Sequence, residues 1–598
     1  MSAPKNIVKR LNIYKKFFKI LIDYARINIS FSITYVSLLI LDSFAKIFSI
    51  ISMAPLVDFL SGDNVGTQQI TLFFKDTLSW FGFEYTLGSS IAVFIIGSSL
   101  GLLTEIFLYS ISRRNAYKLQ YHFISSGIKR FFGRGLKFIN SQSFGIIQNT
   151  FQREISQAGD GVNETLLFVS NIVQVLFMLA LAFSLSVVMS SITLLVLFLI
   201  FIIMYSSSSS LIERLSTKTT ISGNDVSQAL FEPLLNAKQI LSFGRSKHAI
   251  NNHSKVYERH ANDAVLSQTI TYSIPLIFRT FGIIVALVAM YISLSFGESP
   301  SAVVIALVAL IRITPIASQI VASLASISAA VPSLNQFELL FGYIFQKQKQ
   351  KRLISFDGFS DKIQLNNVSY SYGTTKNSVV DINMTIKKNS YVSFIGPSGS
   401  GKTTCIDILI GLLRPSSGHV SIDRDLLEEV DLDSFLAHVG YVQQTPFLFN
   451  GSIRDNLLWS NPSATEKEMW DALHLANIDS FVSSTEYQLD TSVGDRGVSM
   501  SGGQKQRIAL ALALVRHPSI LVLDEATNSL DYESESSVIK ALDKISHKVT
   551  IISISHQPSM AKNSDQVFVF NEGRIVESGT YKDLTREHSS FLSRMSSK

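Results

Sequence analysis

A glycine-rich segment in the second half of the chain has the residue types and spacing that a phosphate chain requires. It follows the apolar run 391–395, opens the helix-like run 404–413, and consists of Gly396, Pro397, Ser398, Gly399, Ser400, Gly401, Lys402, Thr403 and Thr404. Glycines allow a sharp turn in which successive backbone N–H groups converge on one anion, and the helix start adds its positive end. Lys402 can reach the outer phosphates, and the Thr403 hydroxyl can hold Mg²⁺. The segment predicts a P-loop that binds ATP and Mg²⁺.

A second apolar run, 519–523, ends in the acids Asp524 and Glu525. Asp524 at the tip of a buried strand is placed to bind Mg²⁺, and Glu525 can orient or deprotonate an attacking water. An apolar run followed by two acids is common by itself, but its combination with a P-loop indicates ATP hydrolysis.

A third segment, 500–507, precedes another helix-like run and contains Ser501, Gly502, Gly503 and Gln504. Two glycines and a serine at a helix start form a second phosphate-binding nest. One nucleotide does not need two such nests from one chain. We therefore expect this nest to serve a nucleotide held by another copy of the protein.

The composition indicates a membrane protein. Only 16% of the 598 residues are charged, against about 25% in soluble domains, while 47% are hydrophobic. The net charge of +6 is too small to imply a nucleic-acid partner, and the single cysteine, Cys405, excludes an internal disulfide framework. Because the shortage of charge is confined to the first half, that half is expected to cross the membrane.

The apolar stretches predict a transmembrane domain over 1–345, with six spans near 29–60, 89–112, 165–188, 191–212, 265–296 and 301–331. Ser190 and Ser191 are a plausible tip between the third and fourth spans. Residues 5–27 read as a helix on the membrane surface, with a cytosolic extension of the first span as the alternative. A linker, 346–360, and a soluble domain, 361–598, are expected to follow. Strand-like runs at 391–395, 520–523, 550–554 and 567–570 indicate that this domain is α/β.

Loop charges predict the orientation. The segments 113–160 and 213–264 are rich in Lys and Arg, whereas 61–88 and 297–300 are poor. The rich loops therefore face the cytosol, as do both termini. These two loops are expected to extend the spans as helices and to turn near 140–147 and 226–236. The predicted fold is a membrane α-helical bundle of six transmembrane helices with long cytosolic extensions, fused to a cytosolic α/β P-loop ATPase domain. A multi-pass protein of a bacterial inner membrane is expected.

On these motifs, residues 360–590 resemble the nucleotide-binding domain of ABC transporters, and the first half resembles the exporter-type (type IV) transmembrane domain. The resemblance implies roles for five further residues. Tyr372 would stack on adenine, Gln444 would sense the γ-phosphate and ligate Mg²⁺, and Asp495 would be the X-loop acid. Asp531 would belong to the D-loop, and His556 would contact the γ-phosphate. The departures from the family pattern, at Met500, Asn528, Ser529 and Gln557, lie outside the groups that touch phosphate.

The resemblance also implies a partner and a cycle. The P-loop of one copy would face the 501–504 nest of the other, and twofold symmetry would then give two equivalent sites. A homodimer is favoured because Glu525 is present, and a heterodimer is the alternative. ATP would close the two ATPase domains, the membrane cavity would switch from inward-facing to outward-facing, and hydrolysis would reset the cycle.

Arg279 and Arg312 are candidates for binding the cargo, because charges inside spans are costly. The pattern around Arg312 resembles that of PglK-like lipid-linked oligosaccharide flippases, which implies an anionic, lipid-linked substrate. The alternative for Arg312 is a structural ion pair with Asp42 or Glu105, and Asp42 and Lys46 can pair with each other. Export of peptides or lipophilic drugs is the alternative function. An ATP-gated channel or a regulatory, non-transporting protein is a more remote one.

Overall fold

The computed structural model describes residues 3–56, 68–298, 300–345, 353–372, 378–526, 532–555, 561–586 and 591. The chain divides into two compact units. One comprises Met1–Arg134 and Phe138–Gln348, and the other comprises Gly135–Lys137 and Lys349–Lys598. The predicted six-helix bundle and the predicted α/β domain correspond to these two units.

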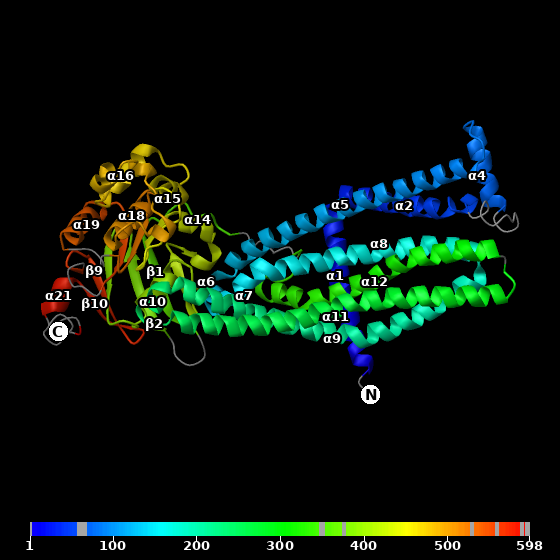
Figure 1. Ribbon diagram of the computed structural model, residues 1–598. Helices are drawn as coiled ribbons and strands as arrows, with labels where there is room; N and C mark the ends of the chain where they lie inside the picture. Colours follow the sequence, from blue (N-terminus) through cyan, green and yellow to red (C-terminus); the bar gives the residue numbers. More distant parts are fainter. Residues whose placement is uncertain are drawn as a thin grey trace. The chain divides into compact units, whose positions relative to one another are not determined.

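The described residues of the first unit include six helices that are long and apolar enough to cross a membrane. They contain α2 (Ile29–Ile51), α5 (Leu87–Gly133), α8 (Ile155–Leu185), α9 (Val187–Leu235), α11 (Ser246–Ser295) and α12 (Pro300–Phe341). Half or less of each apolar window is buried within the chain, so most of these side chains are available to lipid. Helices α2 and α5 lie side by side, α12 packs against α8, and α11 packs against α9 (Figure 1). The predicted fold class is confirmed.

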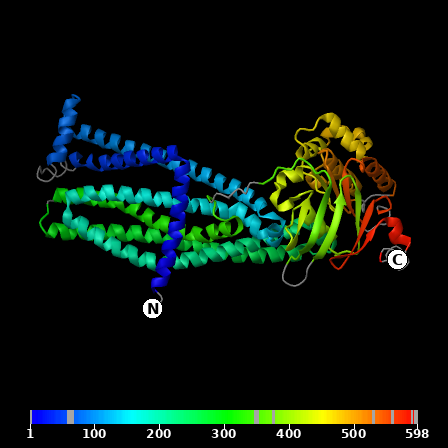
Figure 2. The same ribbon diagram turned by 180° about the vertical axis from the view of Figure 1, so that it is seen from behind.

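A separate helix, α1 (Ala3–Ile27), precedes the first span and runs steeply across the long helices in both views (Figures 1 and 2). It ends before Asn28, whose backbone is not helical (φ −116°, ψ 58°), so α1 does not continue directly into α2. Phe17 and Ile20 are buried in a cluster with Val162 and Ile327. These contacts attach α1 to α8 and α12.

The predicted tip at Ser190 and Ser191 is wrong. The helix breaks at Ser186, whose backbone is extended and whose hydroxyl accepts a hydrogen bond from the Met189 N–H at 3.2 Å. This cap starts α9 at Val187 and leaves Ser190 fully buried in its first turns. The sequence offers several serines here, and only the extended backbone identifies the one that caps.

The turns at the other end of the long helices agree only in part with their expected places. Helix α5 runs to Gly133 and is followed by α6 (Gly135–Ser141) and α7 (Phe144–Asn149), while α9 runs to Leu235 and is followed by α10 (Ala237–Ser242). The glycines at the bends have left-handed backbones, with φ of +77° at Gly135 and +63° at Gly244. The bends therefore lie at 134–135, 142–143 and 236–245: the second falls within the predicted 140–147, the first is an additional bend, and the third begins where the predicted 226–236 ends.

The second unit contains a six-stranded sheet with strand order β10-β9-β3-β8-β7-β6. Its strands are β3 (Tyr391–Ile395), β6 (Val439–Val442), β7 (Ile520–Asp524), β8 (Thr550–Ile554), β9 (Gln566–Asn571) and β10 (Arg574–Gly579). Every pair of neighbouring strands in this sheet is parallel except the β9–β10 pair, which is antiparallel. The four predicted strand runs are confirmed.

The residues of the central strands alternate between two cores. Phe394 and Val522 face one core, while Tyr391 and Leu521 face the other. Every residue of β3, β7 and β8 is buried, which is why these strands read as continuous apolar runs.

An antiparallel sheet of order β2-β1-β4-β5 supplies one of these cores. It contains β1 (Lys362–Tyr370), β2 (Val379–Lys387), β4 (Ser417–Ile422) and β5 (Asp425–Leu426). Helix α13 (Lys402–Leu409) contributes to the same core and ends earlier than the predicted limit of 413, because Gly411 takes a left-handed backbone (φ +79°).

The other core is covered by helices that form a separate part of the unit (Figure 2). They include α15 (Ile453–Ser460), α16 (Glu466–Leu475), α17 (Asp479–Ser484) and α18 (Gly502–Leu514). Further helices are α14 (Leu432–Ala437), α19 (Tyr532–Ile545) and α21 (Tyr581–Arg586). Because β3 and β7 are parallel members of one sheet, their carboxyl ends meet at one edge, where binding sites of α/β sheets form.

Candidate nucleotide site

The P-loop connects β3 to α13, as its sequence predicts. A Cβ atom at Gly396 would come within 2.2 Å of the Phe570 carbonyl oxygen, and one at Gly401 within 2.5 Å of that of Ser378. Both glycines also have positive φ, +155° and +99°. Only glycine allows the loop to pass this close to its neighbours while turning.

Lys402 folds over its own loop. Its Nζ donates to the carbonyl oxygens of Gly396 and Pro397, at 2.9 Å each, and lies 3.4 Å from the Ser400 hydroxyl. The side chain is buried, and this burial lowers the pKa of the ammonium, while Glu525 and Asp524 act in the opposite direction. A phosphate in the loop would offer this ammonium a charged acceptor in place of neutral carbonyls.

Two of the predicted Mg²⁺ ligands lie side by side. The Thr403 hydroxyl donates to Asp524 Oδ1 at 3.4 Å, and the Tyr441 hydroxyl donates to the other carboxylate oxygen at 3.2 Å. A hydroxyl and a carboxylate are hard oxygen donors that suit Mg²⁺, which takes its remaining ligands from phosphates and water. The residues therefore fit the ion.

Asp407 adds an acid that the sequence analysis overlooked. It lies on α13, one turn after Thr403, and is largely buried. Burial raises the pKa of this carboxyl to about 6, and the negative charge of Asp524 adds to the shift. Burial also raises the pKa of Asp524, which the hydrogen bond from Tyr441 opposes. The sequence offered one signal for Asp407: it follows Thr403 by four positions in the predicted helix, so the two side chains share one face.

Glu525 and Gln444 meet directly. Gln444 Nε2 donates to Glu525 Oε2 at 2.6 Å. The backbone of Glu525 is left-handed (φ +50°). Two hydrogen bonds fix it: the Glu525 N–H donates to the Ile554 carbonyl at 3.1 Å, and Gln506 Nε2 donates to the Glu525 carbonyl at 3.4 Å. A strained backbone at the end of a buried strand is typical of functional positions.

These residues line one polar cavity of about 400 Å³. Its lining contains the P-loop residues 398–404, Gln444 and Glu525, together with Ser378, Glu572 and Gly573. The last three were missed from the sequence, because they come from a loop before β2 and from the turn between β9 and β10. The Gly573 N–H donates to the Ser400 carbonyl at 3.0 Å, so this turn supports the P-loop.

Tyr372 lies beside the same loop. Its hydroxyl is 3.4 Å from the Thr404 hydroxyl, and its ring meets that of Tyr370 edge-on, with 5.0 Å between the centroids. The side chain is 50% exposed, so one face of the ring is available to a base. Cys405, in contrast, is fully buried, and burial raises the pKa of its thiol.

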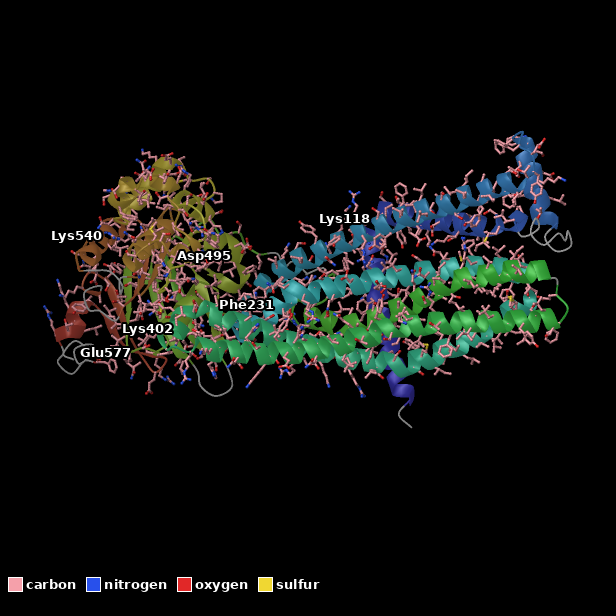
Figure 3. The ribbon with its side chains drawn as sticks, viewed as in Figure 1. Lys118, Phe231, Lys402, Asp495, Lys540 and Glu577 are labelled. Atoms are coloured by element: carbon pink, nitrogen blue, oxygen red, sulfur yellow. The ribbon has the colours of Figure 1, made fainter. Side chains whose placement is uncertain are left out.

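The segment 501–504 forms the start of α18. The Ser501 hydroxyl accepts from the Gln504 N–H at 3.3 Å, and Gln504 Oε1 accepts from the Ser501 N–H at 2.9 Å. Ser501 and Gly502 are exposed, and a Cβ at Gly502 would meet nothing within 4 Å. Among the described residues, none of these four lines the 400 Å³ cavity. Asp495 begins a short 3₁₀ segment, Asp495–Gly497, before this helix (Figure 3).

Asp531 and His556 lie outside the described residues. Arg279 is exposed on α11. Arg312 is half-buried on α12, where it donates to the Ser49 hydroxyl at 2.8 Å and lies over the Phe94 ring.

The alternative ion pairs of Arg312 are not formed among the described residues. Lys46 pairs with Asp42 at 3.0 Å and with Glu105 at 3.7 Å. Asp42 also accepts from Thr104 and Gln174, so this buried carboxylate is satisfied without Arg312.

Comparison with known proteins agrees with this geometry. Residues 379–528 match the family model described as ABC transporter. The whole chain has the fold of a bacterial Atm1-family ABC exporter solved with ATP bound, with a TM-score of 0.80 and 20% identity over 96% of this chain and 98% of that one. The chain therefore has an exporter-type ABC transporter fold and carries an ABC transporter ATP-binding domain.

Curated relatives match over part of their length. ABC transporter B family member 1 of Dictyostelium discoideum is 43% identical over 37% of this chain and 25% of its own length. A sophorolipid transporter of Starmerella bombicola is 41% identical over 37% and 18%, and a multidrug resistance ABC transporter ATP-binding and permease protein of Lactococcus lactis is 37% identical over 39% and 40%. The chain spans two fifths or less of the length of these relatives.

Proposed function

We propose that this protein is an ATP-driven exporter that moves an amphipathic molecule across a membrane. One observation carries the proposal: the P-loop and the Gln444–Glu525 pair line one cavity, and Asp524 lies beside it through its contact with Thr403. The described part of the same chain contains six helices able to cross a membrane. No soluble enzyme would need those helices.

Each residue has a role in the proposed hydrolysis. The P-loop N–H groups and Lys402 bind the phosphates, while Thr403, Gln444 and Asp524 hold Mg²⁺, which neutralises phosphate charge when bound. Glu525 orients the attacking water and accepts its proton. The hydrogen bond from Gln444 positions the Glu525 carboxylate, because it fixes one oxygen at 2.6 Å.

Two residues outside the described part of the chain complete the scheme. His556 is proposed to contact the γ-phosphate, since an imidazole can donate to an anion at neutral pH. Asp531 is proposed to act at the seam between copies.

The working unit is proposed to be a homodimer. The nest at 501–504 is exposed and lies outside the cavity of its own chain, so it is available to a nucleotide on another copy. Two copies related by a twofold axis would complete both sites with the same contacts. A heterodimer with a different chain is the alternative.

Closure of the two ATPase domains on ATP is proposed to drive the membrane helices. ATP favours the closed state because only that state offers it both surfaces. The turns around α6–α7 and α10 would transmit closure, and hydrolysis would release it. The basic loops place the ATPase domain in the cytosol, and the membrane is proposed to be a bacterial inner membrane.

Two kinds of cargo are proposed. Arg279 and Arg312 favour an anionic, lipid-linked molecule such as a lipid-linked oligosaccharide, because a guanidinium can bind such an anion through two parallel hydrogen bonds. The printed name of the sophorolipid transporter agrees with a lipid-like cargo, and that of the multidrug resistance protein agrees with lipophilic drugs. Peptides are a further proposed cargo alongside the lipophilic drugs.

Transport in liposomes tests the proposal. The purified protein should hydrolyse ATP and move a fluorescent amphiphile in one direction only when ATP is present. Hydrolysis without movement of any amphiphile would favour a regulatory protein, and movement down a gradient in either direction would favour an ATP-gated channel.

Arg312→Ala tests the anionic cargo. Loss of the guanidinium should reduce ATP-driven movement of an anionic lipid by about tenfold, the cost of one charged hydrogen bond, and should leave basal ATP hydrolysis within about twofold. Hydrolysis and lipid movement would be measured in the same vesicles. A parallel fall in both would show that Arg312 is structural.

A further inference from the structure

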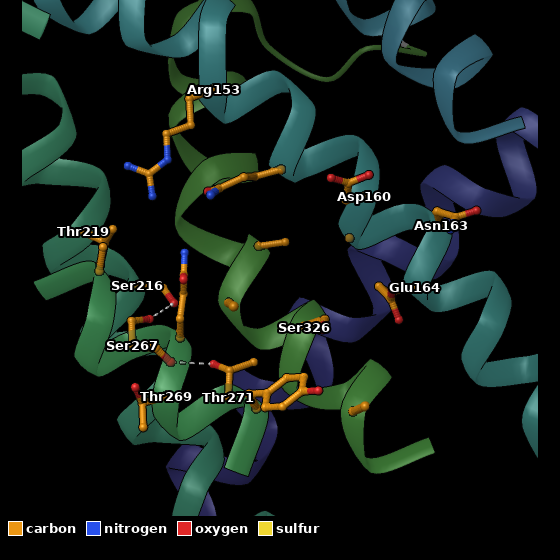
Figure 4. A pocket seen from close by; sticks show the side chains of 18 of the residues that line it. Arg153, Asp160, Asn163, Glu164, Ser216, Thr219, Ser267, Thr269, Thr271 and Ser326 are labelled. Carbon is orange, nitrogen blue, oxygen red and sulfur yellow. Dashed lines mark hydrogen bonds between the residues drawn. The ribbon is translucent and has the colours of Figure 1, made fainter. Parts of the chain in front are cut away.

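The membrane unit contains a cavity of about 750 Å³, with polar and apolar surface, that no sequence motif indicates. It is open to one side and is lined by residues of α5, α8, α9, α11 and α12 and of the π-helical turn Thr150–Glu154 (Figure 4). Its volume lies in the range of about 300–1,000 Å³ that ligand sites of drug-sized molecules occupy. Neither Arg279 nor Arg312 lines it.

We propose that this cavity binds the cargo, and that the cargo carries an ammonium or guanidinium group which Asp160 and Glu164 receive. The inference rests on the proposed function and favours its second kind of cargo, lipophilic drugs and peptides, over the anionic lipid suggested by Arg279 and Arg312, which lie outside this cavity.

The two acids lie one helical turn apart on α8, and both line the cavity from this helix (Figure 4). Each has a neutral donor: Gln120 Nε2 donates to Asp160 at 3.1 Å, and the Ser323 hydroxyl donates to Glu164 at 2.9 Å. Among the described residues, neither acid forms an ion pair. Asp42, on the same bundle, differs because Lys46 neutralises it at 3.0 Å. Both acids precede the predicted span 165–188, so they lie at the cytosolic end of the bundle, where two carboxylates without a bound counter-ion can receive a cationic group.

The two cations of the lining are held elsewhere. Arg153 lies away from the acids in Figure 4 and its guanidinium is 3.2 Å from His260 Nε2. Arg113 is exposed, and its Nε donates to the Tyr109 hydroxyl at 3.1 Å. Arg113 forms no hydrogen bond with either acid among the described contacts, so the carboxylate oxygens can accept hydrogen bonds from a ligand.

The rest of the lining suits an amphipathic molecule. Polar atoms come from Ser216, Thr219, Ser267, Thr269, Thr271 and Ser326, several of which Figure 4 shows facing the cavity. Ala322, Ala329 and Pro275 add apolar surface. A ligand with a cationic end, hydrogen-bonding groups and an apolar part would satisfy all three kinds of surface.

A matched pair of fluorescent probes tests the sign of the charge. Dansyl cadaverine ends in an ammonium, and dansyl-6-aminohexanoate ends in a carboxylate on a similar chain. Binding of both to the full-length protein in liposomes would be measured by dansyl fluorescence, together with ATP hydrolysis and ATP-driven uptake. The double variant Asp160→Asn, Glu164→Gln removes both charges and keeps shape and hydrogen-bond acceptors. Glu105→Gln, an exposed span residue outside the cavity, is the control.

We expect the wild type to bind the cationic probe saturably, and the double variant to bind it about tenfold or more weakly, because a charge-assisted contact is lost. Glu105→Gln should bind as the wild type does. Equal affinity for both probes, absence of saturable binding, or an unchanged double variant would overturn the inference. Selective binding without ATP-driven uptake would overturn the proposed function and the role of the cavity in transport, and would leave only the cation site formed by Asp160 and Glu164 standing. ATP-driven uptake that is equal for the two probes and unchanged in the double variant would support the proposed function and overturn the inference.

Discussion

Glu525→Gln should reduce steady-state ATP hydrolysis by about a hundredfold or more and leave ATP binding within a few-fold of wild type. The amide cannot take a proton from water, whereas the P-loop, Lys402 and Thr403 are unchanged. Glutamine has the size of glutamate, so the contacts of the Glu525 backbone with Ile554 and Gln506 should persist. Phosphate release and retention of labelled ATP on the purified protein would measure the two effects.

Glu572→Gln is the matched control, because it makes the same chemical change on another residue that lines the cavity. Its hydrolysis should fall less than tenfold. Hydrolysis by Glu525→Gln at the wild-type rate, or equal losses in the two variants, would contradict the assignment of Glu525 as the base.

Lys402→Met should weaken ATP binding by about a hundredfold, because a buried charge-assisted contact with the phosphates is worth several kcal/mol. Methionine fills a similar volume without a charge. Its cost to folding is expected to be that of one buried hydrogen bond, at the Gly396 carbonyl, because Pro397 is exposed and water can replace the ammonium there. Binding would be measured by titration with a fluorescent ATP analogue, and folding by the melting temperature.

Lys388→Met, on an exposed residue beyond β2, supplies the control for loss of one positive charge. ATP binding by Lys402→Met that equals that of the control would contradict the P-loop role. A large fall in the melting temperature of Lys402→Met alone would show that the lysine chiefly supports its own loop.

The local parts of this architecture follow from the sequence. The P-loop, the strand that ends at Asp524 and the cap at Ser501 depend on residues within a few positions of one another, and periodicity and glycine placement indicate each of them. The six spans are equally local, because about 20 apolar residues in succession suffice.

Features that depend on distant residues could not be read in this way. Gly573 supports the P-loop across more than 170 positions, and the 750 Å³ cavity collects side chains from Arg113 to Ala330. The choice between Ser186 and Ser190 as the tip depends on Ser186 meeting Ser293, 107 positions away, and Glu298 beyond it. Arg279 and Arg312 were singled out because charges in spans are rare, but rarity does not show whether a side chain faces a cavity.

Site-directed cross-linking tests the central claim, that ATP is clamped between the P-loop of one copy and the 501–504 nest of another. Cys405→Ala removes the native thiol, and Glu525→Gln retains ATP. In this background, Ser398→Cys in one tagged chain and Gly502→Cys in a differently tagged chain place thiols at two exposed positions.

After co-expression and treatment with a short bis-maleimide, the account predicts a covalent dimer that carries both tags and forms only with ATP. Each variant expressed alone should give no dimer. Absence of the mixed product, or its formation without ATP, would contradict the account.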